Sequence, residues 1–80
     1  MRDQIQATII TIGDELLIGQ VIDTNSAFIA QKLNAIGVVV KQRIAVGDDA
    51  LSITNALDTA IQNSQIVILT GGLGPTADDI

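Results

Sequence analysis

The chain has 80 residues, of which 48% are hydrophobic and 16% charged, and its net charge is -5. This length suits one compact domain and is short for a complete doubly wound fold. Only four residues are Lys or Arg. Because phosphate neutralisation by basic side chains supplies most of the affinity for nucleic acid, the composition excludes that class of partner and favours a small molecule.

The composition also indicates where the protein works. The chain has no cysteine, so disulfides and zinc-thiolate sites are excluded. The residues after Met1 are polar and then alternating, a pattern that predicts neither a signal peptide nor a membrane-spanning segment. We therefore expect a cytoplasmic protein that does not contact a membrane. We also expect it to form a homo-oligomer.

Three strands are predicted from runs of β-forming residues. Residues 7–12 and 66–70 are apolar runs that each stop at a glycine, and both are interpreted as buried central strands. Residues 38–46 form the other strand, in which polar and apolar residues alternate, so one face should be wetter. Lys41 and Arg43 are interpreted as part of that exposed face, and a phosphate clamp is the alternative interpretation.

Two amphipathic helices are predicted between these strands. The first begins at an N-cap among residues 23–25 and stops at Gly37. The second spans about residues 49–63 and is capped by Asp48 or Asp49. The resulting β-α-β-α-β order predicts an α/β fold of three layers, α/β/α, with a doubly wound and mainly parallel sheet in the strand order 2-1-3.

The end of the chain resembles a helix start. Thr76 and Asp79 have the spacing of a capping box, in which two side chains satisfy free amides at the beginning of a helix. We expect that helix to continue past Ile80. Residues 1–80 are accordingly expected to be the N-terminal portion of a single, longer domain.

Glycines followed by polar or acidic residues end all three predicted strands. The carboxyl ends of parallel strands meet at one edge of a sheet, where ligands of this fold class bind. After the third strand, a glycine-rich loop leading into a helix N-terminus would offer backbone amides to a phosphate, although a tight turn explains the same glycines equally well. The candidate ligand contacts in this loop are Thr70, Gly71, Gly72, Gly74, Pro75 and Thr76.

Acidic residues are concentrated at the same edge. They would repel a phosphate unless a divalent cation such as magnesium bound between them, so the pattern predicts a metal. The simpler interpretation of Asp48, Asp49 and Asp79 is helix capping. The side-chain oxygens of residues 23–26 offer a second candidate contact to the ligand, and Asn25 and Ser26 are the residues assigned to it. An N-cap cluster is again the simpler explanation. The acidic set comprises Asp14, Glu15, Asp48, Asp49, Asp78 and Asp79.

Four sequence blocks follow one another along the chain, namely Thr11–Leu17, Gly19–Asn25, Val46–Asp49 and Thr70–Asp79. In this order they resemble the N-terminal domain of the CinA family, a branch of the molybdopterin-binding superfamily that includes molybdopterin adenylyltransferases. The resemblance covers nearly the whole chain and implies a three-layer α/β/α domain whose glycine loop binds pterin or nucleotide phosphates.

The resemblance also implies roles for particular residues. The catalytic or metal-associated carboxylates of the superfamily match Asp48 and Asp79, with Asp14 beside them, and Asp49 is an alternative to Asp48. The CinA-like branch is similar to enzymes that split the pyrophosphate of ADP-ribose with a divalent metal. Molybdopterin adenylyltransferases usually have Gly-Gly-Thr-Gly where this chain has Leu73 in the third position, which favours the CinA-like branch.

Three functions follow as hypotheses. The first is a metal-dependent nucleotide-sugar pyrophosphohydrolase, similar to an ADP-ribose pyrophosphatase, in which residues 71–74 bind the diphosphate. Its catalytic residues would be Asp48 and Asp79, and its metal ligands Asp14, Asp48 and Asp79. The second is a molybdopterin-binding or molybdopterin adenylyltransferase domain. The third is a non-catalytic ligand-binding fragment.

Overall fold

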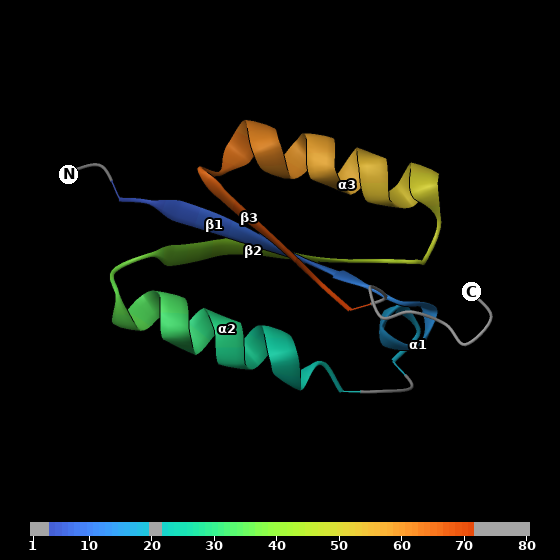
Figure 1. The fold of residues 1–80 in the computed structure, drawn as a ribbon, viewed down its shortest axis with the longest axis horizontal. Coiled ribbons are helices and arrows are strands. Elements are labelled where there is room, and N and C mark those ends of the chain that lie inside the picture. Colours follow the sequence, from blue (N-terminus) through green and yellow to red (C-terminus); the bar gives the residue numbers. More distant parts are fainter. Residues whose placement is uncertain (1–3, 20–21, 72–80) are drawn as a thin grey trace, which may run out of the picture.

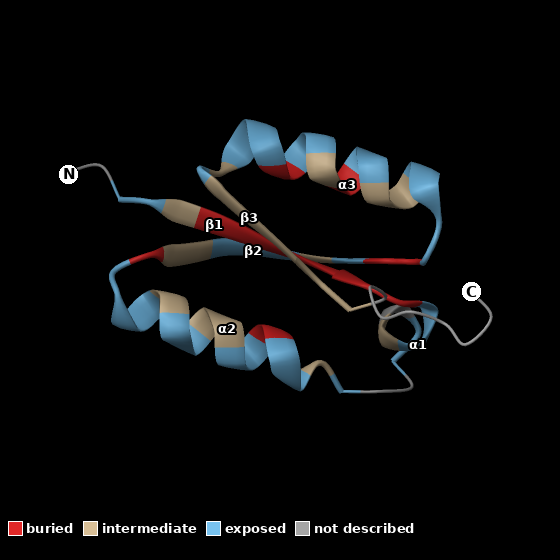
Figure 2. Ribbon diagram, in the orientation of Figure 1, coloured by how far each residue is buried: buried red, intermediate tan, exposed pale blue. Residues whose placement is uncertain are grey.

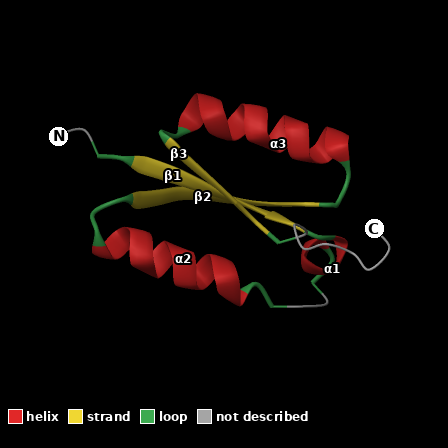
Figure 3. Ribbon diagram, in the orientation of Figure 1, coloured by secondary structure: helices red, strands yellow, loops and turns green. Residues whose placement is uncertain are grey.

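The structure is a computed structural model that describes residues 4–19 and 22–71. Within these residues three strands form one parallel sheet in the order β2-β1-β3. Helices α2 and α3 lie on opposite faces of this sheet, and a short helix α1 follows the first strand (Figures 1 and 3). The elements are β1 (Gln6–Ile12), α1 (Asp14–Leu17), α2 (Thr24–Ala35), β2 (Val39–Val46), α3 (Ala50–Asn63) and β3 (Ile66–Thr70).

This architecture confirms the predicted fold class. The chain folds into a three-layer α/β/α arrangement with the strand order 2-1-3, and the bounds of the three strands and of α2 and α3 differ from the predicted ones by about a residue. The additional element, α1, has only four residues, which is too short to produce a helical hydrophobic period. Among the described residues, no helix combines the length and the hydrophobicity needed to cross a membrane.

The central strand β1 is buried along almost its whole length (Figure 2). Ile9 and Ile10 are both 0% exposed, and since successive side chains of a strand point to opposite faces, both faces of β1 are covered.

The exposed residues of β2 confirm its predicted wetter face. In β3 every residue is half-buried. The interpretation of β3 as a buried central strand is therefore wrong for the described residues, because only β1 is paired with it there.

Helix α3 closes one face of the sheet through small residues. Ala60 is fully buried and Ala56 nearly so, and side chains of this size let the helix approach the strands closely. Together with residues of β1 and β2 they form a hydrophobic cluster, against which half-buried residues of β3 also pack. The cluster consists of Ile10, Ile12, Val46, Ala56 and Ala60.

Both long helices begin at an aspartate cap. Asp23 Oδ1 accepts the backbone N–H of Ser26 at 3.0 Å and starts α2. At the start of α3 the structure distinguishes the two neighbouring candidates, because Asp49 is the N-cap. The predicted stop of α2 is also confirmed, since Gly37 has a φ of 88°, a left-handed conformation that favours glycine.

The Asp49 cap predicts a specific dependence of stability on pH. The backbone N–H and the hydroxyl of Ser52 both donate to its carboxylate, at 2.8 and 2.9 Å, and these bonds lower the pKa of Asp49 from its usual 3.8. A lowered pKa in the folded state stabilises the protein above the unfolded-state pKa, and this stabilisation is lost as the pH falls through the folded-state value.

We therefore expect Asp49→Asn, which keeps a side-chain acceptor at the cap, to make stability less sensitive to pH between about pH 5 and pH 2. The measurement is the urea midpoint of the intact protein, followed by circular dichroism across this range. Asp49→Ala should lower the midpoint at neutral pH, because the cap is lost. Parallel pH profiles for the parent and Asp49→Asn would contradict the assignment.

Candidate functional site

A cavity of about 270 Å³ lies at the carboxyl ends of β1 and β3. Its wall comes from three segments that are separate in the sequence, namely α1, the beginning of α2 and the end of β3. This is the edge at which parallel α/β sheets bind their ligands. The lining residues are Glu15, Leu16, Ile22, Asp23, Thr24, Asn25, Thr70 and Gly71.

Gly71 lets the chain leave β3 in close contact with β1. Its φ is 81°, and a Cβ atom added to it would lie 2.6 Å from the carbonyl oxygen of Ile12 and 3.3 Å from Cδ1 of Leu16. The first of these distances is shorter than real contacts allow, and a carbonyl of the buried central strand has little freedom to move. A glycine is therefore required here by both the backbone conformation and the available space.

The first turn of α2 forms the opposite wall of the cavity. Thr24 and Asn25 line it, and the backbone amides of a first helical turn have no acceptors within their own helix. Such amides and the helix dipole favour an anion or a hydrogen-bond acceptor at this position. Ser26, in the same turn, is fully buried, and its Oγ has no hydrogen-bond partner among the described residues.

The acidic ends of β1 and β2 are held together beside this cavity. The backbone N–H of Asp48 donates to Oδ1 of Asp14 at 3.2 Å, and the N–H of Gly13 donates to the carbonyl of Val46 at 3.0 Å. Asp14 and Asp48 are both exposed. Neither lines the cavity, but Asp14 is the chain neighbour of Glu15, which does.

The predicted magnesium site can be tested against these side chains. Within residues 4–19 and 22–71, no three acidic residues gather closely enough to hold a metal ion. Magnesium commonly uses one or two protein carboxylates together with phosphate oxygens of the substrate. Asp14 and Asp48 fit that partial donor set, whereas Asp49 has both of its oxygens engaged by Ser52. These contacts favour Asp48 over Asp49 as the candidate ligand.

The structure places the predicted site residues in three groups. Asn25, Thr70 and Gly71 line the cavity, Asp14 and Asp48 lie together beside it, and Ser26 is buried in the first turn of α2. Five predicted residues lie outside the described residues, and their assignments stay predictions. These are Gly72, Gly74, Pro75, Thr76 and Asp79.

Sequence reasoning assigned no ligand contact to several residues of the cavity wall. Glu15 was recognised as one of the acids at the sheet edge, and its position after Gly13 and Asp14 was the available signal. Asp23 and Thr24 were considered as helix caps and, within residues 23–26, as a possible second contact to the ligand. Leu16 and Ile22 carry no chemical signature, so their place in the wall follows only from the course of the chain.

The structure has a parallel sheet between two layers of helices and a cavity at the carboxyl ends of its strands. In this class of α/β domain, small molecules bind at that position. A sequence model of the family described as "Probable molybdopterin binding domain" matches residues 8–80, and the chain belongs to this family.

The relatives place the chain in the CinA-like branch, as the four sequence blocks predicted. It is 52% identical over 75 residues to a CinA-like protein of Flavobacterium psychrophilum. The matched residues make up 94% of this chain and 18% of that protein. It is also 52% identical over 80 residues to a CinA-like protein of Cytophaga hutchinsonii, covering all of the chain and 19% of the relative. The chain thus spans about a fifth of the length of these curated relatives.

A solved structure supports the same conclusion. The crystal structure of the protein CinA with unknown function from Thermoplasma acidophilum is 42% identical in sequence and superposes with a TM-score of 0.85. The match covers 92% of this chain and 44% of that one. The likeness in fold and the match to the family model therefore lead to the same assignment.

Gly71→Ala should be more destabilising than Gly37→Ala. Both glycines have a left-handed φ, 81° and 88°, but a Cβ at Gly37 would meet nothing within 4 Å. Both variants should lose about 1–2 kcal/mol of unfolding free energy from the conformation alone, and Gly71→Ala should lose more through its clash with Ile12. Urea unfolding of the intact protein measures the difference. Equal losses would show that the end of β3 does not press against β1.

Proposed function

We propose that the chain is the diphosphate-binding part of a metal-dependent pyrophosphohydrolase that acts on a nucleotide sugar such as ADP-ribose. The observation that carries this proposal is the cavity between the N-terminus of α2 and the end of β3, with Asp14 and Asp48 beside it. Its volume of about 270 Å³ lies just below the usual range of ligand pockets, roughly 300–1,000 Å³. It is suited to one part of a nucleotide sugar.

The groups around the cavity support a phosphate as that part. In the first turn of α2 the N–H groups of Thr24 and Ser26 already donate to Ile22 and Asp23, which leaves the amide of Asn25 and the hydroxyl of Thr70 as the proposed donors to phosphate oxygens. Gly71 also lines the cavity, and its lack of a side chain lets the end of β3 lie against Ile12.

Asp48 is the proposed general base. Water would attack one phosphorus atom, the bridging P–O bond would break, and the bridging oxygen would leave with the second phosphate. One proton of the water would pass to the carboxylate of Asp48 and then to solvent. Asp14 would orient the Asp48 loop by accepting its backbone N–H. A divalent ion held by Asp14 and by phosphate oxygens would neutralise charge in the site, and the carboxylate of Asp48 would then be free to accept the proton.

The proposal retains the assignments that lie outside the described residues. Gly72, Gly74, Pro75 and Thr76 would extend the phosphate-binding loop, and Asp79 would be the further catalytic or metal-binding carboxylate. These assignments rest on the match of the family to residues 8–80.

A second candidate function is molybdopterin binding, or the adenylation of molybdopterin with ATP. The family description supports it, whereas Leu73 in place of the threonine usual in adenylyltransferases counts against adenylation. Incubating the intact protein with ADP-ribose, and separately with ATP and molybdopterin, distinguishes the two. If neither is turned over, the third hypothesis, a non-catalytic binding module, is favoured.

Asp48→Asn should lower the turnover of ADP-ribose by about 10²–10⁴-fold in the intact protein, because it removes the proposed base. Asp49→Asn is the matched control, since it removes the same charge from the next residue and leaves an acceptor at the α3 cap. The control should turn over near the parent rate. The assignment fails if Asp48→Asn hydrolyses ADP-ribose as fast as the parent while retaining its circular dichroism spectrum.

A further inference from the structure

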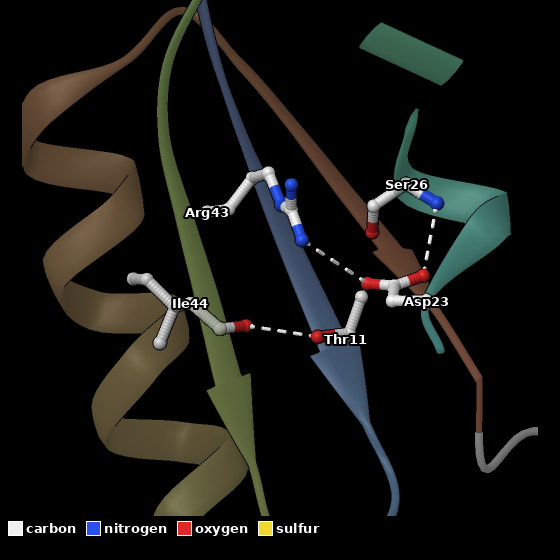
Figure 4. Close-up of polar contacts among 5 residues, drawn as sticks. All are labelled: Thr11, Asp23, Ser26, Arg43 and Ile44. Atoms are coloured by element: carbon white, nitrogen blue, oxygen red, sulfur yellow. Dashed lines mark hydrogen bonds and ion pairs between the residues drawn. The ribbon is translucent and has the colours of Figure 1, made fainter. Parts of the chain in front are cut away.

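Arg43 contacts the wall of the cavity although its strand contributes no residue to that wall. Its guanidinium Nη2 lies 3.8 Å from Oδ2 of Asp23, and Asp23 lines the cavity. Figure 4 shows this side chain extending from β2 toward the start of α2. Twenty positions separate the two residues in the sequence, and the sheet brings them together.

Both oxygens of the Asp23 carboxylate are engaged. Oδ1 accepts the backbone N–H of Ser26 at 3.0 Å and caps α2, while Oδ2 faces Arg43. The Asp23 side chain is only 16% exposed, so water screens its charge poorly. Within the described residues, Arg43 is the basic side chain that faces this carboxylate.

This balance matters because the cavity wall is acidic. Glu15 and Asp23 line it, and no Lys or Arg of residues 4–19 and 22–71 does. An anionic ligand would meet two negative charges there, which would oppose the favourable effect of the helix N-terminus.

The other basic residues in the described part of the chain are lysines, and they make contacts elsewhere. Lys32 lies over the ring of Phe28, with its Nζ 5.3 Å from the centroid. Lys41, on the same strand as Arg43, donates to the carbonyl of Asn63 at the last residue of α3. Within residues 4–19 and 22–71, Arg43 is thus the cation in contact with the cavity wall.

We propose that Arg43 is a specificity-determining residue of this cavity, which lets it accept a phosphorylated ligand by neutralising Asp23. The inference deepens the proposed function and rests on it for the phosphate, but it makes its own claim about why an acidic cavity tolerates an anion. Without Arg43, the carboxylate of Asp23 still caps α2 through a backbone amide, but its charge is unbalanced. Removal of Arg43 should therefore lower the affinity for anions and leave the free energy of unfolding nearly unchanged.

The ion pair itself contributes little to stability. Arg43 is 54% exposed, and pairs with an exposed partner at this distance are weak. Arg43→Gln is accordingly expected to unfold at nearly the parent urea concentration. A structural role alone would leave the affinity for phosphates unchanged in such a folded variant.

The experiment is calorimetry on the intact protein with magnesium, using ADP-ribose and inorganic pyrophosphate as separate probes. Arg43→Gln should weaken the binding of both by about tenfold, the effect of exposing one poorly screened charge near the ligand. Lys41→Gln is the matched control, because it removes the same charge from the same strand at a site away from the cavity. It should bind both probes like the parent.

A double variant provides the decisive arm. Asp23→Asn keeps an acceptor for the Ser26 amide but removes the charge that Arg43 balances, so Asp23→Asn combined with Arg43→Gln should recover the affinity lost in Arg43→Gln. Equal effects of Arg43→Gln and Lys41→Gln, or no recovery in the double variant, would overturn the inference.

The two probes separate this inference from the proposed function. If the parent binds pyrophosphate but not ADP-ribose, the proposed substrate is wrong and the role of Arg43 is judged on pyrophosphate alone. If the parent binds neither probe, the cavity does not take phosphates and both claims fall.

Discussion

The burial of β1 is the constraint on which the rest of this structure depends. β2 and β3 pair with its two edges, and residues 7–12 are buried on both faces. A strand surrounded in this way has no room for ionised side chains, so the charged residues of this region follow the strand. The turn at Gly13, the short helix α1 and the acids Asp14 and Glu15 are consequently collected at one edge of the sheet, where the cavity lies.

The elements that depend on local signals were predictable from the sequence. Runs of β-branched residues ending in glycine indicated the strands, Gly37 indicated the end of α2, and its N-cap was narrowed to residues 23–25, of which the structure selects Asp23. α1 was missed because four residues contain no period. The half-buried state of β3 was also missed, since the burial of a strand depends on its neighbours in space and not on its own residues.

The candidate site was predictable only where topology decided it. Parallel strands bring their carboxyl ends together, which correctly placed Asp14 beside Asp48 and Thr70 at the cavity. The sequence did not distinguish Asp48 from Asp49 as the N-cap of α3. The choice depends on which residue has the extended backbone that precedes the helix, and in the structure this is Asp49. The pairing of Arg43 with Asp23 had no sequence signal, because it joins two elements through the lateral order of the strands. The proposal above connects Arg43 to the site through Asp23, whereas the sequence offered an exposed strand face or a direct phosphate clamp.

The central claim is that the cavity between the first turn of α2 and the end of β3 holds the phosphate part of a nucleotide sugar. A crystal structure of the intact protein with ADP-ribose and magnesium tests it most directly, using Asp48→Asn to prevent turnover. The account predicts that phosphate oxygens lie within hydrogen-bonding distance of the backbone amides of Asn25 or Gly71. A ligand bound with its phosphates outside the wall formed by Glu15, Asp23, Asn25, Thr70 and Gly71 would contradict it.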